Sequence, residues 1–179
     1  ARGRRGRAPA TEGATARCDG PAAAPEQAAG KRVAVFERER LGSGETGNTS
    51  AHLTYVTDLR LSELVRRFGK DAAEVVWRGG ATALDVIETH VEERDIACGF
   101  RRVPDFVYAA IHGDKDESDD LREETRLANE LGFNARFLEK GPILSKPAVA
   151  YADQALFHPL MYLAGLARAI EGDGSVICE

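Results

Sequence analysis

The segment that most constrains what this chain can fold into is residues 30–54, GKRVAVFERERLGSGETGNTSAHLT. Residues 33–36 form a continuous apolar run of strand length, which predicts a strand buried on both faces of a parallel sheet. Glu37 ends this run, and an acid at the tip of such a strand can accept hydrogen bonds from both hydroxyls of a ribose. An ordinary polar strand end explains Glu37 equally well, so its position alone leaves both interpretations open.

The loop after the strand consists largely of small and hydroxyl-bearing residues, namely Gly42, Ser43, Gly44, Thr46, Gly47, Thr49 and Ser50. The run G-S-G-E-T-G-N-T matches the P-loop pattern except at one position, where Asn48 replaces the lysine that neutralises the terminal phosphates. Glu45 would also add negative charge beside the phosphates, so the loop argues against an NTPase. Small residues can still hold a diphosphate or a ribityl chain with backbone amides and hydroxyls. A flexible connection without a ligand is the alternative.

The composition excludes several other classes of protein. A formal net charge of -5 gives no sign of the basic face that a nucleic-acid binder needs. No apolar run approaches the roughly 18 residues of a membrane helix, and no apolar core of a secretory signal follows the basic start. Cys18, Cys98 and Cys178 are odd in number and far apart. They predict neither a disulfide framework nor a metal site, and they favour a reduced, cytoplasmic setting.

Residues 1–30 differ from everything after them. They are almost all Ala, Arg, Gly and Pro, and they include no Val, Ile, Leu, Phe, Tyr or Trp. Such a segment has little apolar surface to bury against the entropy of ordering, which predicts a disordered head. The one helix candidate inside it is residues 22–29, which Pro25 interrupts.

Two helices are predicted after the loop. The first has Ser62 as its N-cap, continues to Phe68 and stops at Gly69. The second spans residues 71–94, and its predicted apolar face consists of Ala73, Val76, Ala83, Leu84, Ile87 and Val91. The adjacent Gly79 and Gly80 reduce helix stability, so the helix either kinks there or lets another backbone come close.

The middle of the chain predicts strands around one further helix. Residues 100–103 and 106–111 are expected to form two strands separated by a turn at Pro104 and Asp105. The acidic run at residues 114–124 is interpreted as a solvated loop and helix start, and not as an ion site. That helix should cover residues 118–131 and stop at Gly132. Residues 133–138 and 155–157 are predicted as strands.

The C-terminal pattern predicts a helix followed by a strand. His158 is expected to cap the helix and Pro159 to open it. The predicted buried stripe consists of Leu160, Leu163, Ala164, Ala167 and Ile170. Residues 175–178 should then form a strand, completing the second half of a crossover unit. This strand is expected to lie parallel to residues 33–36 in one sheet.

Few single side chains indicate chemistry. His52 is interpreted as structural more readily than catalytic, because a lone histidine is a weak signal. His90 and His112 are expected to face solvent, whereas Trp77 and Tyr162 are expected in the core or at an interface. No Ser-His-Asp or Cys-His set and no His/Cys/acid cluster with metal-ligand spacing can be assembled.

Two motifs carry a resemblance to a known family. KRVAVFERERLGSGETGNTSAHLT resembles the second strand and flavin loop of FAD-dependent oxidoreductases of the D-amino-acid oxidase superfamily. QALFHPLMYLAGLARAIEGDGSVI is similar to the later helix–strand unit of that superfamily. The combination resembles a bacterial subgroup, some members of which carry a Rieske-type iron–sulfur domain. The resemblance covers about residues 30–179.

The resemblance implies a role in FAD binding for each matching position. Glu37 would bind the adenosine ribose and Arg38 would lie near the adenine. The diphosphate region would be lined by Ser43, Gly44, Glu45 and Thr46. The ribityl chain and isoalloxazine ring would lie beside Thr49, Ser50, Ala51, His52 and Leu53. The implied reaction is hydride transfer from a C–N bond of an amine or amino acid to the flavin.

The resemblance also implies a fold and a domain division. The expected fold class is α/β, a fragment of a Rossmann-like FAD/NAD(P)-binding domain with part of an inserted α+β substrate domain. Residues 31–97 would be the first part of the FAD-binding domain, residues 98–154 part of the substrate domain, and residues 155–179 the returning helix and strand. A P-loop-like nucleotide-binding protein and a flavin-free binding module are the alternative functions.

The pattern departs from the family at both ends, and at the C-terminal end it stops at Glu179, before the rest of the substrate domain and the C-terminal half of the flavin site. No strand precedes Gly30, and the head has no G-x-G-x-x-G, whose amides would hold the pyrophosphate. GC-rich DNA translated in a wrong reading frame gives a composition of Ala, Arg, Gly and Pro. This leads to the hypothesis that the coding frame is broken upstream of Gly30, or that the sequence comes from a damaged gene fragment. Residues 1–179 are therefore expected to be inactive alone, and the strand at residues 33–36 to have an exposed edge.

Overall fold

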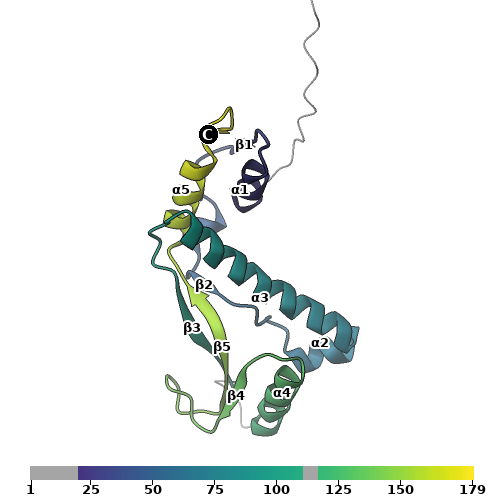
Figure 1. Ribbon diagram of the computed structural model, residues 1–179. Coiled ribbons are helices and arrows are strands. Elements are labelled where there is room, and N and C mark those ends of the chain that lie inside the picture. Colours follow the sequence, from purple (N-terminus) through teal and green to yellow (C-terminus); the bar gives the residue numbers. More distant parts are fainter. Residues whose placement is uncertain (1–19, 111–116) are drawn as a thin grey trace, which may run out of the picture.

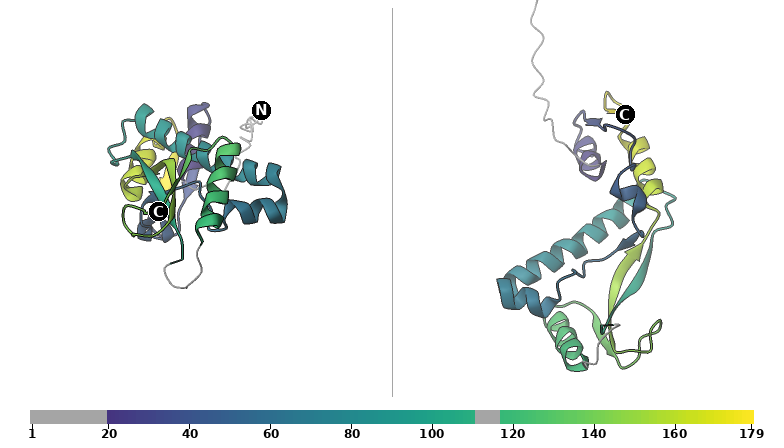
Figure 2. Two further views of the ribbon diagram at one scale, coloured as in Figure 1. Left: turned by 90° about the horizontal axis from the view of Figure 1, so that it is seen from below. Right: turned by 180° about the vertical axis from the view of Figure 1, so that it is seen from behind.

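The computed structural model describes residues 20–110 and 117–179, which form an elongated molecule with a sheet at each end (Figure 1). One sheet is two-stranded and lies with the first and last helices: α1 (Gly20–Ala28), β1 (Ala34–Phe36), α5 (Pro159–Ile170) and β6 (Val176–Cys178). The other sheet is four-stranded: β2 (His52–Leu53), β3 (Arg101–Tyr108), β4 (Ala135–Leu138) and β5 (Ala148–Leu156). It lies with three helices: α2 (Leu61–Phe68), α3 (Lys70–Glu93) and α4 (Ser118–Glu130). Figure 2 shows α3 crossing the molecule between the two ends.

The parallel pairing of the first and last strands is confirmed. Val35 of β1 lies opposite Ile177 of β6 in a parallel register. The expected burial on both faces is wrong, however, because Val35 is buried while Ala34 and Phe36 are exposed. The reason is that the described helices beside this sheet, α1 and α5, cover only the face that carries Val35.

The expectation of disorder for residues 1–30 is wrong for residues 20–28, which form α1. Ala23 and Ala24 are buried in the same cluster as Val35, so small side chains pack closely where large ones are missing. The helix ends in a Schellman arrangement at Gly30, which has a φ of 79°. The Lys31 N–H donates to the Glu26 carbonyl, and the Gly30 N–H donates to the Gln27 carbonyl. Residues 1–19 lie outside the described residues.

The four-stranded sheet is organised around β5, most of which the sequence pattern did not predict. Residues 155–157 were expected as a short strand, but β5 covers nine residues and pairs with β2, β3 and β4. The two strands expected around Pro104 are one strand, β3, whose register against β5 shifts between Val103 and Asp105. A bulge tolerates proline, which has no N–H to donate to the ladder.

The helices agree with the predicted spans within a few residues, with different starts and buried faces. Ser62 is not the N-cap of α2, because the Glu124 carboxylate of α4 accepts the N–H groups of Leu61 and Ser62 at 2.9 and 3.0 Å. The α4 helix ends before Gly132 as predicted, and β4 follows. His112 and residues 114–116 of the acidic run lie outside the described residues.

The buried faces of α3 and α5 differ from the predicted stripes. In α3, Trp77 and His90 are buried while Val76 is 49% exposed, so the solvent-facing prediction for His90 is wrong. The close approach expected at the glycine pair is confirmed at Gly80, where an added Cβ would lie 2.8 Å from Tyr55 Cβ. The predicted stripe of α5 is wrong apart from Ile170, since its buried residues are Pro159, Tyr162, Gly165, Leu166 and Ile170.

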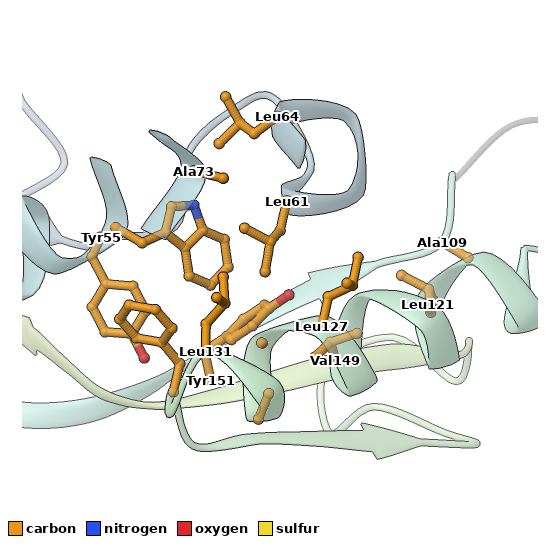
Figure 3. Close-up of a cluster of buried hydrophobic side chains, with 14 residues drawn as sticks. Tyr55, Leu61, Leu64, Ala73, Ala109, Leu121, Leu127, Leu131, Val149 and Tyr151 are labelled. Carbon is orange, nitrogen blue, oxygen red and sulfur yellow. The ribbon is translucent and has the colours of Figure 1, made fainter. Parts of the chain in front are cut away.

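Two hydrophobic clusters hold the described residues together. The cluster beside the four-stranded sheet surrounds Trp77, whose ring centroid lies 5.2 Å from that of Phe133 and 5.5 Å from that of Tyr151. Figure 3 shows how Tyr55, Leu61 and Tyr151 of this cluster lie together. The second cluster joins α1, β1 and α5 and includes Ile96 and Cys98. In the described residues, no helix is both long and apolar enough to cross a membrane. The division into flavin and substrate parts stays a prediction.

Candidate functional site

A cleft of about 500 Å³ lies between the two sheets, beside the start of α5. Three segments that are far apart in sequence line it: residues 47–51, residues 98–101 and residues 156–160. Strand pairing brings them together, because Leu156 of β5 lies opposite both His52 of β2 and Arg101 of β3. The His158 N–H also donates to the Cys98 carbonyl at 2.7 Å. The cleft is therefore built by the sheet and by the start of α5.

The start of α5 is fixed by the capping contact predicted for His158. Its Nδ1 atom accepts a hydrogen bond from the Met161 N–H at 3.4 Å, and Pro159 takes the first helical position. Further along the helix, Gly165 lets Ile96 pack against the backbone, because an added Cβ would lie 2.4 Å from Ile96 Cγ2. This packing places the segment around Cys98 beside the start of α5.

The glycine-rich loop folds tightly onto the beginning of α5. A Cβ added at Gly47 would lie 2.3 Å from the Gly42 carbonyl oxygen, and one added at Gly42 would lie 2.4 Å from Leu160 Cδ2. Asn48, which replaces the P-loop lysine, donates from Nδ2 to the Gly44 carbonyl at 3.2 Å. Asn48 therefore stabilises the turn η1 (Glu45–Asn48).

Glu37 follows the last residue of β1, at the carboxyl edge of the parallel pair. Its N–H donates to the Cys178 carbonyl at 2.8 Å, which fixes the backbone at this point. Its Oε1 atom accepts the Glu39 N–H at 3.0 Å. The carboxylate is partly exposed, so it can accept further hydrogen bonds from a ligand at the sheet edge.

The residues that the resemblance implicates separate into two groups. Thr49, Ser50 and Ala51 line the cleft, and His52 and Leu53 form β2 beside it. The other group, which does not line the cleft, follows β1 and extends into η1: Glu37, Arg38, Ser43, Gly44, Glu45 and Thr46. Only Gly47 and Asn48 separate the two groups in sequence, and the chain runs through both between the end of β1 and the cleft.

Sequence reasoning missed two of the three walls of the cleft. Cys98, Gly99 and Arg101 were given no role, although the glycine marks a sharp turn with a φ of 66°. Residues 156–160 were predicted as a strand end and a helix start but were given no role in the site. The signal that could have identified this wall was His158-Pro159 itself, because a capped helix start directly after a strand often faces a ligand site.

His52 of β2 lies near an acid of β3, on the other side of β5. Its Nε2 atom lies 3.9 Å from Asp105 Oδ1, and Thr54 Oγ1 lies 3.5 Å from the other carboxylate oxygen. Asp105 sits at the bulge of β3 and accepts the Phe106 N–H at 2.7 Å. Among the described residues, no group of three or more His, Cys, Asp and Glu side chains could hold a metal ion.

Two consecutive arginines at the start of β3 have different environments. Arg102 is held by Glu88, by Asp85 and by the Asp153 carbonyl, at distances of 2.6 to 3.0 Å. Arg101 lines the cleft, is exposed, and has no ion-pair partner within the part of the chain that the structure describes. Arg101 can therefore bind an anionic group of a ligand in the cleft.

Acidification is expected to destabilise the packing of α3 on α5. His90 Nδ1 lies 3.0 Å from Tyr162 Oη, and both side chains are buried. Burial, and next the charge of Arg94, lower the pKa of His90, while burial raises the pKa of Tyr162 to about 12. The unfolded chain therefore binds the His90 proton at a higher pH than the folded chain. The free energy of unfolding should fall as the pH drops from about 6.5 through the lowered pKa of His90.

Urea unfolding between about pH 5 and pH 8 measures this dependence. The His90→Gln variant keeps a polar partner for the Tyr162 hydroxyl but does not titrate, so it should lose part of the acid destabilisation. An identical pH dependence in both proteins would contradict the assignment to His90.

Comparisons with known proteins identify the class of protein to which this fold belongs. The family model for FAD dependent oxidoreductase (DAO) matches residues 20–179. The putative Rieske 2Fe-2S iron-sulfur protein YhfW of Bacillus subtilis strain 168 is 30% identical over 152 residues, covering 84% of this chain and 29% of that protein. Glycine oxidase from Geobacillus kaustophilus has a TM-score of 0.63 at 19% identity, over 90% of this chain and 42% of that one. L-proline dehydrogenase from P. horikoshii has a TM-score of 0.63 at 14% identity, over 89% of this chain and 40% of that one.

The chain belongs to the FAD dependent oxidoreductase family, and the resemblance to the D-amino-acid oxidase superfamily is confirmed. The α/β, Rossmann-like fold class is also confirmed. The match begins at residue 20, so it includes α1, which the sequence pattern had assigned to a disordered head. The chain spans less than half the length of each of these three relatives.

Proposed function

We propose that this chain binds FAD along the path from Glu37 to the cleft, as part of an oxidoreductase acting on an amine or amino acid. The observation that carries the proposal is the wall of the cleft formed by Thr49, Ser50 and Ala51. This wall directly continues the segment that starts at the ribose-type acid. A volume of about 500 Å³ lies within the usual range for small-molecule sites.

The residues present fit a flavin. A Cβ added at Gly99 would meet no atom within 4 Å, so the cleft is open at that point. Leu156 and Phe157 give it an apolar wall, and Thr49 and Ser50 give it hydroxyls, which suits a flat ring with a polar edge. In this proposal Glu37 binds the ribose, Arg38 lies near the adenine, and Ser43, Gly44, Glu45 and Thr46 contact the diphosphate. His52 and Leu53 contact the ring together with the wall.

Bound FAD would supply the hydride acceptor, and the protein supplies orientation and a shielded site. Leu156 and Phe157 would exclude water from one side of the ring. Asp105 would hold the His52 imidazole in place. Arg101 would bind the carboxylate of an amino-acid substrate, and the names of the neighbours glycine oxidase and L-proline dehydrogenase support this choice of substrate class.

Titration of the purified chain with FAD tests the proposal. Binding should give a protein that absorbs near about 450 nm, as flavoproteins do, and should quench flavin fluorescence. ATP at the same concentration should not displace the flavin, because Asn48 replaces the lysine of a P-loop. Purified chain that takes up no FAD would overturn the proposal and favour a flavin-free binding module.

Replacing Arg101 by Gln is expected to weaken amino-acid binding by about 10- to 100-fold, the range of a charge-assisted hydrogen bond. The measurement is the change that glycine produces in the absorbance of the bound flavin. Methylamine, which is glycine without the carboxylate, should bind both proteins equally. Arg136→Gln, at an exposed position on β4 outside the cleft, is the matched control. Equal loss for glycine and methylamine would contradict the role of Arg101.

We also propose that this chain is part of a longer protein, which passes electrons to an iron–sulfur centre in the cytoplasm. The support is the likeness to the relative named as a Rieske protein. Electron paramagnetic resonance of the longer protein tests this, because adding substrate should produce the signal of a reduced 2Fe-2S centre. A flavin that is reoxidised by oxygen alone, with no such signal, would contradict it.

A further inference from the structure

The outer face of α3 is apolar and is not covered by any described element. The face consists of Ala72, Val75, Val76, Gly79, Thr82, Ala83 and Val86. Val75 is 70% exposed, Val76 49% and Val86 46%. These positions repeat every seven residues, as in a helix that packs along a second helix. In Figures 1 and 2, one long side of α3 has no helix or strand packed against it.

Gly79 lies at the centre of this face, and the fold itself does not account for it. Its neighbour Gly80 is explained by the contact with Tyr55. A Cβ added at Gly79 would meet no atom within 4 Å, and its φ is not positive. Glycine inside a helix is unfavourable relative to alanine, so an internal glycine is expected where another backbone comes close.

The sizes of the side chains on this face are complementary to a second copy of itself. If two copies pack antiparallel with Gly79 facing Gly79, each valine meets a smaller residue. Val75 faces Thr82 of the second copy, Val76 faces its Ala83, and Val86 faces its Ala72. In a parallel pair the valines would face valines and the glycines would leave a gap, so the pattern favours the antiparallel arrangement.

Charges next to the face do not oppose this contact. Arg78 already donates to Glu74 Oε1 at 2.7 Å and to the Leu131 carbonyl at 2.8 Å. Asp85 already accepts a hydrogen bond from Arg102 at 2.6 Å. The face itself carries no charged residue, so a close contact buries apolar surface without stranding a charge.

We infer that α3 forms a two-fold antiparallel contact between two copies of this chain, centred on Gly79. A single helix face is smaller than the roughly 800 Å² per partner of a standard stable interface. The dimer should therefore be weak and depend on concentration. This inference does not rest on the proposed function, because the face lies outside the cleft.

Sedimentation equilibrium of the 179-residue chain over a range of concentrations tests the inference. The unmodified chain should dimerise, and Val76→Lys should weaken the dimer by about tenfold or more, as burial of an unpaired charge predicts. Adding Ala83→Glu to Val76→Lys should restore the dimer, because the antiparallel contact puts opposite charges at both 76–83 pairs. Ile143→Lys, at an apolar position that is 77% exposed outside α3, is the matched control and should change nothing.

The outcomes separate the arrangements clearly. A chain that stays monomeric at every concentration, or a Val76→Lys variant that dimerises as well as the unmodified chain, overturns the contact. A dimer that Val76→Lys weakens and that Ala83→Glu does not restore overturns the antiparallel arrangement. Gly79→Leu should also weaken the dimer without unfolding the helix, as circular dichroism would show.

Discussion

Gly47→Ala is expected to lower FAD affinity by about tenfold or more and to destabilise the fold by about 1–3 kcal/mol, the usual range for overpacking. The new Cβ would lie 2.3 Å from the Gly42 carbonyl oxygen, so the loop has to open. Leu160 lies against Gly42, so Gly42 cannot move away from the new Cβ without disturbing the start of α5. Flavin titration and thermal unfolding measure the two effects.

Gly44→Ala is the matched control for this change. Gly44 lies in the same loop, but a Cβ there would meet no atom within 4 Å. Its backbone has a φ of -85° and a ψ of -144°, outside the α and β regions, so Gly44→Ala tests backbone strain without a steric clash. This variant should keep its flavin affinity and lose less stability than Gly47→Ala. If Gly47→Ala behaves like Gly44→Ala, the loop is not held by the Gly42–Gly47 contact.

Trp77→Ala is expected to lower the free energy of unfolding by about 3–5 kcal/mol, the range found for removing a large buried aromatic side chain. Trp77 is 1% exposed and its ring contacts Tyr55, Phe133 and Tyr151. Its Nε1 atom also donates to Thr57 Oγ1 at 3.3 Å. The loss is a large part of the 5–15 kcal/mol that stabilises an ordinary domain.

Urea unfolding followed by circular dichroism measures this loss, because Trp77 is the only tryptophan and its fluorescence disappears with it. Trp77→Phe keeps most of the ring contacts and should cost about 1–2 kcal/mol through the smaller volume. Equal destabilisation by Ala and Phe would mean that the hydrogen bond to Thr57 matters more than the packing.

Local signals in the sequence predicted the elements with strong patterns. The apolar run before Glu37, the capped start at His158 and the stops at Gly69 and Gly132 are all read from neighbouring residues, and the structure has them. The parallel pairing of β1 with β6 followed from the helix–strand order of a crossover unit.

Features that depend on distant contacts could not be predicted in this way. The N-terminus of α2 is capped by Glu124 from another helix, so the expected local cap at Ser62 was not needed. Alanine-rich α1 is stable because Ala23 and Ala24 pack against other elements, which composition alone does not reveal. Two walls of the cleft come from segments that only the pairing of β5 brings together.

The path of α3 has a mechanical consequence. Its residues Ala73 and Trp77 belong to the cluster beside the four-stranded sheet, whereas Ile87 and Val91 pack in the cluster around α5. One continuous helix therefore contributes to both hydrophobic clusters and links the two sheets. Bending of the molecule between the sheets would have to bend α3 or break its packing on one of these clusters.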